Sequence, residues 1–329
     1  MIISRTPFRI SFFGGGTDYP KWFTDNGGAV LSTSIDKYCY ISLRKLPPFF
    51  EHKHRIVYSK VESVKSEDKI AHPVVRAVLS HIEVNDGLEI HHDGDLPARS
   101  GLGSSSSFTV GLLNAIYAYK GSFISSRKLA EEAIHIEQNI IGENVGSQDQ
   151  VAAAIGGLNK ISFNQDGSFS VSPIIISRSV TDNFQKHLLL FFTGVSRFSS
   201  DIAEAQLKNM SKKEKELLRM HDMVDMAISI LNSNDMDSFG ELMKESWDLK
   251  SSLSSMIASQ KIKEIYETAI SAGATSGKIL GAGGGGFIMF FAKPQYHMQI
   301  KRKLNNLVNV PFNFEREGSQ IVLYEPNGL

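Results

Sequence analysis

The sequence predicts an α+β protein built from two domains. Strand-like and helix-like segments do not alternate one by one, as they would in a doubly wound parallel sheet. The first half mixes short strands with helices, whereas the second half is rich in helices and closes with strands. The chain has 329 residues, of which 42% are hydrophobic and 21% are charged. That length suits about two domains, and that composition supplies enough apolar side chains for their cores.

The individual elements follow from the periodicity of the apolar residues. Runs rich in Val, Ile, Tyr and Phe predict strands at 2–13, 36–43, 55–59, 88–92, 156–163, 171–176, 187–192 and 320–323, and a segment of glycine and strand residues at 279–291. Apolar residues spaced three and four apart predict helices at 73–82, 104–119, 125–140 and 295–307, and an almost wholly helical stretch over 199–266. The change in composition places the domain boundary near residue 180, which gives domains 1–180 and 181–329.

Charge and cysteine content narrow the class of function. Lys plus Arg and Asp plus Glu each number 35, so the formal net charge is zero, which argues against nucleic-acid binding through bulk positive charge. No apolar run approaches the roughly 18 to 20 residues that span a bilayer, and the N-terminus lacks the features of a signal peptide. The single cysteine, Cys39, fits a reducing compartment. We therefore expect a cytoplasmic protein that binds small molecules.

A stretch rich in glycine and serine, 97–107, directly precedes the predicted helix 104–119. Glycines let the backbone approach a phosphate closely, and a helix N-terminus offers N–H groups and the positive end of the helix dipole. The simpler alternative is a flexible turn with a serine cap, but the spacing before the helix favours phosphate binding. The residues expected to bind the phosphates are Pro97, Arg99, Ser100, Gly101, Leu102, Gly103, Ser104, Ser105 and Ser106.

Three segments together resemble the motifs of the GHMP kinases, which include galactokinase, homoserine kinase and mevalonate kinase. Segment 97–107 matches the second family motif, P-x-x-x-G-L-G-S-S, segment 6–19 resembles the first, and segment 278–286 resembles the third. The order and spacing are those of the family across nearly the whole chain. The resemblance implies an N-terminal domain like ribosomal protein S5, a ferredoxin-like C-terminal domain, and ATP in the cleft between them.

The resemblance also assigns residues to phosphoryl transfer. Asp149 matches the aspartate that serves as catalytic base in members that have one, and Arg9 matches the basic residue near the transferred phosphoryl group. Glu137 matches the glutamate that binds magnesium, and Ser105 supplies a second oxygen for the metal. Without the glycine motifs, Glu137 would be interpreted as a solvated helix charge and Asp149 as a helix cap.

The first motif also indicates the substrate. Galactokinases carry Gly-Glu-His-Thr-Asp-Tyr where this chain has Gly-Gly-Gly-Thr-Asp-Tyr-Pro at 14–20, so the Glu and His that help to bind galactose are missing. The glycine version resembles the branch of D-glycero-D-manno-heptose 7-phosphate kinases, which form the 1,7-bisphosphate on the route to nucleotide-activated heptose for bacterial surface polysaccharide. The residues expected to bind the sugar are Gly15, Gly16, Thr17, Asp18, Gly283 and Gly284.

A sugar phosphate needs a cation outside the ATP site. Arg197 is slightly favoured, because its loop follows a buried-looking strand, and Arg44, Arg99 and Lys278 remain alternatives. Two other functions stay open: a kinase of an unphosphorylated sugar, such as galactose, fucose or glucuronate, and a non-catalytic member of the family that binds sugar or ATP for regulation. The cofactors expected are ATP and Mg²⁺, and the sequence does not predict the oligomeric state.

Overall fold

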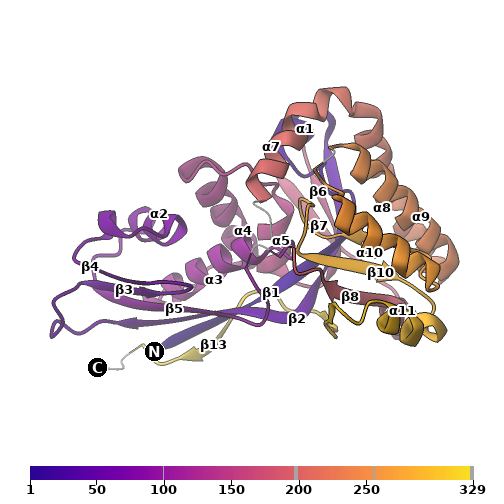
Figure 1. Cartoon of the computed structure of the whole chain (residues 1–329). Coiled ribbons are helices and arrows are strands. Elements are labelled where there is room, and N and C mark those ends of the chain that lie inside the picture. The colour runs from indigo at the N-terminus through magenta and orange to yellow at the C-terminus, as the bar shows by residue number, and fades with distance from the viewer. Residues whose placement is uncertain (99, 196–198, 255, 327–329) are drawn as a thin grey trace.

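The computed structural model describes residues 1–98, 100–195, 199–254 and 256–326, and the strands of these residues form two sheets (Figure 1). The larger sheet contains β1 (Ile2–Phe13), β2 (Gly28–Lys45), β3 (His54–Val57), β4 (Val61–Val64), β5 (Leu88–Gly94), β6 (Leu158–Phe163), β7 (Phe169–Pro173), β12 (Phe314–Glu315) and β13 (Gln320–Tyr324). The smaller, antiparallel sheet has the order β11 (Val308–Asn309), β8 (Leu188–Phe192), β10 (Phe287–Phe291), β9 (Ser276–Ile279).

Helices accompany both sheets and confirm the mixed α+β class. The first half contains α1 (Pro20–Asn26), α2 (Pro73–His81), α3 (Ser104–Tyr119), α4 (Ser126–Ile134) and α5 (Gln148–Ile155), and a π-helical turn (His135–Ile140) follows α4. The second half contains α6 (Arg178–Lys186), α7 (Ser199–Asn209), α8 (Glu214–Ser233), α9 (Met236–Ser252), α10 (Gln260–Ser271) and α11 (His297–Lys303). Among the described helices, none is long and apolar enough to cross a membrane.

The structure differs from the expected elements in several places. The strand expected at 36–43 lies in the second half of the much longer β2. The helix expected at 125–140 is α-helical only as far as Ile134 and then continues as the π-helical turn, a change that the spacing of apolar residues does not reveal. Helix α5 was not expected, because its eight residues are too few to give a clear helical period.

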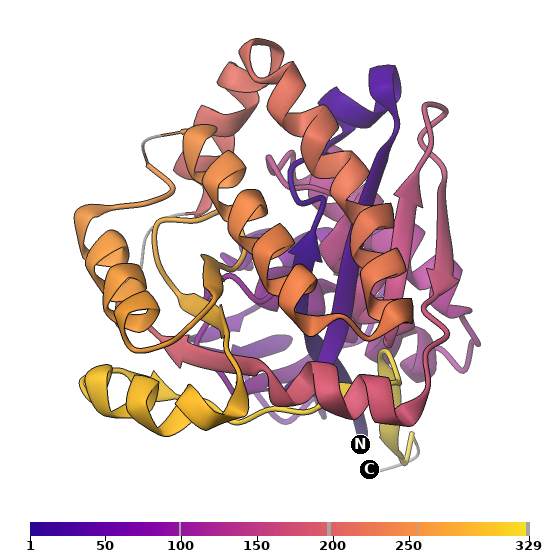
Figure 2. The ribbon, with the colours of Figure 1, turned by 90° about the vertical axis from the view of Figure 1, so that its right-hand side faces the viewer.

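The expected domains 1–180 and 181–329 do not correspond fully to the two sheets, because the last strands of the second range belong to the larger sheet. Strand β12 pairs with β2, and β13 pairs with β1, so the last strands return to the larger sheet. In both views the N-terminus of the chain lies next to β13 (Figures 1 and 2). Sequence order alone cannot reveal such a return, because strand pairing depends on contacts between residues far apart in the chain.

Strand β1 contains most of the first family motif and lies at the centre of the molecule. Its last eight residues are buried, and it contacts α3, α8 and α9, with α8 and α9 lying in front of it in Figure 2. Phenylalanine rings connect it to the smaller sheet: Phe12 lies 5.0 Å from Phe184, Phe184 lies 4.7 Å from Phe239, and Phe239 lies 5.4 Å from Phe291, measured between ring centroids. These aromatic contacts fix the two sheets against each other.

Candidate active site

An ion pair between β1 and α5 lies at the centre of the candidate site. The guanidinium group of Arg9 donates from Nε and Nη2 to the two carboxylate oxygens of Asp149, each over 2.7 Å. Its Nη1 donates to the carbonyl oxygen of Gly101, also over 2.7 Å. The Arg9 side chain is 4% exposed and the Asp149 side chain 25%, so the carboxylate is the member of the pair that solvent and ligands reach. The structure therefore brings the two expected catalytic residues into direct contact.

The second and third glycine motifs meet beside this pair. A side chain at Gly101 would lie 2.3 Å from the carbonyl oxygen of Leu280, and one at Gly281 would lie 2.6 Å from the Cα of Gly101. Further along, the backbone N–H of Phe287 donates to the carbonyl oxygen of Ser100 over 3.0 Å. Only glycine permits so close an approach of two backbones. The sequence identified both loops, and the structure places them in contact.

Helix α3 begins next to the ion pair. Its N-cap residue is Gly103, with φ +76°, so no side chain caps the first turn. A Cβ at that position would lie 3.2 Å from Cγ of Arg9 and 3.4 Å from Oδ2 of Asp149. The positive end of the helix dipole therefore opens onto the Asp149 carboxylate, an arrangement suited to holding a phosphate beside a proton acceptor.

Glu137 lies behind this helix and is fully buried in the π-helical turn. Its carboxylate accepts hydrogen bonds from Ser106 (2.9 Å), Thr109 (2.5 Å) and Gln150 (2.5 Å). Burial raises the pKa of Glu137 to about 7, because these three neutral donors offset the lost hydration only in part. Ser105, the other expected metal ligand, is exposed in the first turn of α3, and it is its neighbour Ser106 that contacts Glu137.

This arrangement fits a magnesium ion that is held mainly by phosphate. A buried carboxylate with only neutral partners favours the approach of a cation, and Mg²⁺ prefers oxygen ligands. Among the described residues no group of three or more His, Cys, Asp and Glu side chains is placed to hold a metal by itself. Magnesium in nucleotide sites needs only one or two carboxylates, with phosphate and water completing its shell.

The first glycine motif positions Asp18 close to the ion pair. Asp18 is 2% exposed, and its Oδ1 accepts a hydrogen bond from the backbone N–H of Gly16 over 2.9 Å. A side chain at Gly146 would lie 2.0 Å from Oδ2 of Asp18, so only glycine fits there. Burial raises the pKa of Asp18, the Gly16 hydrogen bond opposes this rise, and the nearby Asp149 charge adds to it. Asp18 is thus held rigidly beside Asp149, and its role in binding sugar stays a prediction.

Other residues expected to bind the substrate have structural tasks. Thr17 is fully buried, and its hydroxyl contacts the carbonyl oxygens of Gly14 (2.8 Å) and Ala29 (2.9 Å), so the expectation that it binds sugar is wrong: it holds the loop together. The Cβ position of Gly283 lies 2.9 Å from Ile257, and the N–H of Gly284 donates to the Ile257 carbonyl oxygen. These two glycines pack the third loop onto its neighbour, and their contact with substrate stays a prediction.

Two of the cations expected to bind the sugar phosphate already have partners within the fold. Arg44 pairs with Glu89 on the neighbouring strand β5, which satisfies its charge. Lys278 is 2% exposed, and its Nζ donates to the carbonyl oxygen of Phe12 over 2.6 Å, so it joins β9 to β1 within the fold. Lys278 is therefore not an accessible phosphate ligand, whereas the Arg44 side chain is 44% exposed and its binding of phosphate stays a prediction. Arg99 and Arg197 lie outside the described residues.

Lys250 is a residue of the site that no sequence motif marks. It extends from α9, is 6% exposed, and donates from Nζ to the carbonyl oxygens of Gly281 (2.5 Å) and Ile279 (3.3 Å). Burial lowers its pKa to about 8, the charge of Arg9 lowers it further, and Asp18 and Asp149 oppose the shift. Lys278 is the other cation that interacts with it. Lys250 thus holds the third glycine loop, which in turn packs against Gly101.

The low pKa of Lys250 predicts an alkaline limit to activity. Below pH 8 its ammonium group is charged and holds the Gly281 carbonyl most strongly, and above pH 8 the charge is lost. We expect kcat to fall as pH rises through about 8. The Lys250→Met variant should be slower by roughly tenfold, and its pH profile should lack this alkaline fall, the alkaline limb. Lys250→Arg, which stays charged, should keep more activity and also lack the limb. An unchanged alkaline limb in Lys250→Met would show that another group causes it.

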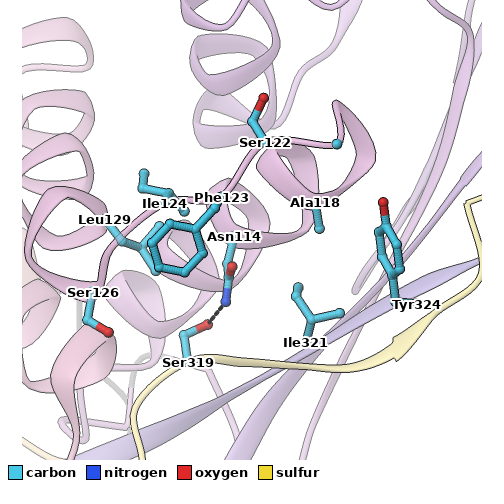
Figure 3. A pocket seen from close by; sticks show the side chains of 11 residues that line it. Asn114, Ala118, Ser122, Phe123, Ile124, Ser126, Leu129, Ser319, Ile321 and Tyr324 are labelled. Carbon is cyan, nitrogen blue, oxygen red and sulfur yellow. Dashed lines mark hydrogen bonds between the residues drawn. The ribbon is translucent and has the colours of Figure 1, made fainter.

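A cavity of about 420 Å³ lies away from these groups (Figure 3). Its wall includes Ala118, fourteen residues along α3 from Ser104, or about 21 Å at 1.5 Å per residue. None of its lining residues is charged, so it lacks the cations that phosphates require. The residues that line it are Asn114, Ala118, Gly121, Ser122, Phe123, Ile124, Ser126, Leu129, Ser319, Ile321 and Tyr324.

Comparison with known proteins identifies the family. The model of the GHMP kinases N terminal domain matches residues 69–157, and that of the GHMP kinases C terminal domain matches residues 227–309. The D-glycero-alpha-D-manno-heptose 7-phosphate kinase of Campylobacter jejuni is 30% identical over 335 aligned residues, which cover 96% of this chain and 97% of that protein. The chain belongs to the GHMP kinase family. The expected family is thereby confirmed, and with it the expectation of an ATP-dependent kinase.

Solved structures agree on the GHMP kinase fold. A D-glycero-D-manno-heptose 1-phosphate kinase from Bacteroides thetaiotaomicron superposes with a TM-score of 0.81 at 24% identity, covering 98% of this chain and 99% of that one. The phosphomevalonate kinase of Streptococcus pneumoniae, solved with phosphomevalonate and AMPPNP, gives a TM-score of 0.75 at 16% identity, covering 95% and 100%. At such identities the likeness concerns the fold alone.

Proposed function

We propose that this GHMP kinase transfers the γ-phosphoryl group of ATP to the anomeric hydroxyl of D-glycero-D-manno-heptose 7-phosphate, forming the 1,7-bisphosphate. The observation that carries the reaction type is the Arg9–Asp149 pair at the N-terminus of α3, where the three glycine motifs meet. The similarity to the Campylobacter jejuni enzyme over almost the full length of both chains supports the choice of substrate.

In this mechanism Asp149 is the catalytic base. Its carboxylate accepts the proton of the sugar hydroxyl while the hydroxyl oxygen attacks the γ-phosphorus and ADP leaves. Arg9 fixes both carboxylate oxygens, so the base has one orientation and its remaining lone pairs face the accessible side. The same guanidinium places positive charge next to the phosphoryl group in transit, where negative charge spreads over three oxygens.

Helix α3 and the glycine loops hold the nucleotide. The N–H groups at the start of α3 bind the phosphates. Gly103 keeps the space beside Arg9 and Asp149 free of a side chain, and Gly101 lets the third glycine loop pack against the second. Glu137 and Ser105 would hold magnesium, which neutralises phosphate charge when it is bound. Ser106, Thr109 and Gln150 keep the Glu137 carboxylate in one orientation.

The phosphate already present on the sugar requires a cation near the first motif. A crevice of about 10 Å³ beside Gly16 is lined by Gln206, Met210, Lys213, Leu217 and Leu253. Among these lining residues Lys213 is the cation, and it pairs with Glu216 over 2.7 Å at an exposed fraction of 30%. A sugar phosphate can exchange this surface partner at low cost, because exposed ion pairs contribute little stability. We assign Lys213 to the sugar phosphate.

A panel of sugars tests the proposed function. We expect kcat/KM for D-glycero-D-manno-heptose 7-phosphate to exceed that for galactose, fucose or free mannose by roughly 10²-fold, because a site built for a dianion leaves its cations unpaired when a neutral sugar binds. The product should show a new phosphorus–proton coupling at position 1 by NMR. Comparable kcat/KM for a free hexose would support the unphosphorylated-sugar alternative, and tight binding without turnover would support a regulatory protein. A bisphosphate with the new group elsewhere would refute anomeric transfer.

A further inference from the structure

Two polar atoms next to the ion pair are buried without a hydrogen-bond partner. They are Oγ of Ser11 and Oε1 of Gln148. Ser11 is 7% exposed and Gln148 is 9% exposed, so bulk water does little to satisfy either atom. A buried polar atom without a partner costs roughly 1 to 3 kcal/mol, so such atoms need an explanation in a folded protein. A ligand that supplies the missing hydrogen bonds is one such explanation.

Both residues are close to the catalytic pair along the chain. Ser11 follows Arg9 by two positions on β1, so the two side chains lie on the same face of the strand. Gln148 immediately precedes Asp149 in the first turn of α5. The position that a Cβ would take at Gly15 is 3.8 Å from Oγ of Ser11 and 3.8 Å from Nε2 of Gln148, with no closer atom. The missing side chain of Gly15 therefore leaves space beside both residues.

The neighbouring carboxylate determines what Gln148 offers to a ligand. Its side chain hydrogen-bonds Asp18, and a carboxylate accepts only from the amide N–H, so Nε2 faces Asp18. Oε1 is consequently left as an acceptor, which needs an O–H or N–H donor. Ser11 adds a hydroxyl that both donates and accepts. An acceptor and a hydroxyl, both uncharged and both beside Gly15, suit the hydroxyl groups of a sugar.

We propose that Ser11 and Gln148 bind hydroxyl groups of the sugar and hold its reactive end against Asp149. This inference rests on the proposed function in one respect, namely that the acceptor substrate is a sugar. Gly15 provides the space for the sugar, and Asp18 orients the Gln148 amide from the opposite side. The two residues act in positioning and specificity, and neither accepts the proton that is transferred.

Ser11→Ala gives the sharper test, because it removes the unpartnered atom and nothing else. We expect KM for the sugar to rise roughly 3- to 15-fold, as the loss of one neutral hydrogen bond implies, with KM for ATP unchanged. The melting temperature should stay equal or rise, because no hydrogen bond within the fold is lost. Gln148→Met should raise KM for the sugar by a similar or larger factor.

Ser4→Ala is the matched control. Ser4 lies on the same strand and is also buried, but its hydroxyl donates to the carbonyl oxygen of Gly111 over 2.7 Å. This variant should lose thermal stability and keep the wild-type KM for both substrates. Opposite effects of the two serine variants would separate a ligand contact from a fold contact.

Monodeoxy analogues of the accepted sugar complete the experiment. An analogue that lacks the hydroxyl contacted by Ser11 or by Gln148 should bind more weakly than the full sugar to the wild type. The variant of the residue that contacts this hydroxyl should bind the analogue as tightly as the wild type does, because the hydrogen bond is already absent. If the wild type phosphorylates a sugar but both variants keep its KM, the inference is wrong and the proposed function stands, with water filling the space at Gly15. If the wild type neither binds nor phosphorylates any sugar of the panel, the proposed function and this inference both fail.

Discussion

Asp149→Asn should slow phosphoryl transfer by roughly 10²- to 10⁴-fold, the usual contribution of a general base. The variant keeps the size of the side chain but loses the charge that accepts the proton. One of the two contacts with Arg9 is also lost, because the new amide N–H faces a guanidinium donor. Single-turnover rates with saturating ATP measure the chemical step directly.

Binding and fold provide the controls for this variant. Calorimetric affinity for ATP should remain close to wild type, whereas the melting temperature should fall modestly, because the Arg9 side chain, which is 4% exposed, loses its charged partner. Asp166→Asn changes a loop carboxylate that bonds only to its neighbour Ser168 and should have no effect on rate. A normal rate in Asp149→Asn would mean that the loose transition state of phosphoryl transfer needs no base here.

Arg9→Met should be the most damaging substitution in the site. It removes the cation that faces the transferred group, for which losses of roughly 10³- to 10⁵-fold are typical of arginines in phosphoryl transfer. It also leaves the Asp149 carboxylate near the charge of Asp18 without its arginine partner, and the Gly101 carbonyl oxygen without its donor. We expect a loss of about 2 kcal/mol in the free energy of unfolding, measured in urea, which is less than for a fully buried pair because Asp149 retains solvent contact.

The double variant Arg9→Met with Asp149→Asn tests whether the pair acts as a unit. If Arg9 works mainly by orienting Asp149, the double variant should be no slower than Arg9→Met alone, and part of the lost stability should return. Arg5→Met is the matched control, since Arg5 lies on the same strand but bonds to Gln320 and stacks on Tyr38. Additive losses in rate would assign the two residues independent roles.

The sequence predicts those features of the site that depend on backbone conformation. The glycines at 101 and 103 have positive φ, and their spacing before a helix is visible without a structure. The same spacing does not reveal that Gly101 packs against Leu280, because 179 residues separate the two positions. Motifs therefore indicate which loops bind phosphate, and the contacts between loops require the fold.

The sequence does not predict the roles of site residues that lie outside the motifs. Lys250 is one of many lysines in a helical region, and nothing in its neighbours distinguishes it from a solvated charge until α9 is placed against Gly281. Thr17 shows the opposite error, since its place in a motif suggested contact with sugar while its hydroxyl is taken up by backbone carbonyls. Side-chain roles in this site depend on burial and partners, which local sequence does not encode.

The pairing of β13 with β1 has a consequence for synthesis of the chain. Arg5 of β1 bonds to Gln320 of β13, which comes 315 positions later in the chain. Strand β1 therefore cannot pair with β13 until the residues between them have left the ribosome. Until then the edge of β1 that faces β13, at residues 2–5, is unpaired, and unpaired strand edges are the kind of surface on which nascent chains associate wrongly. Contacts of such sequence separation also slow folding. The strand that carries Arg9 is thus open to mispairing during translation until its last partner strand has been made.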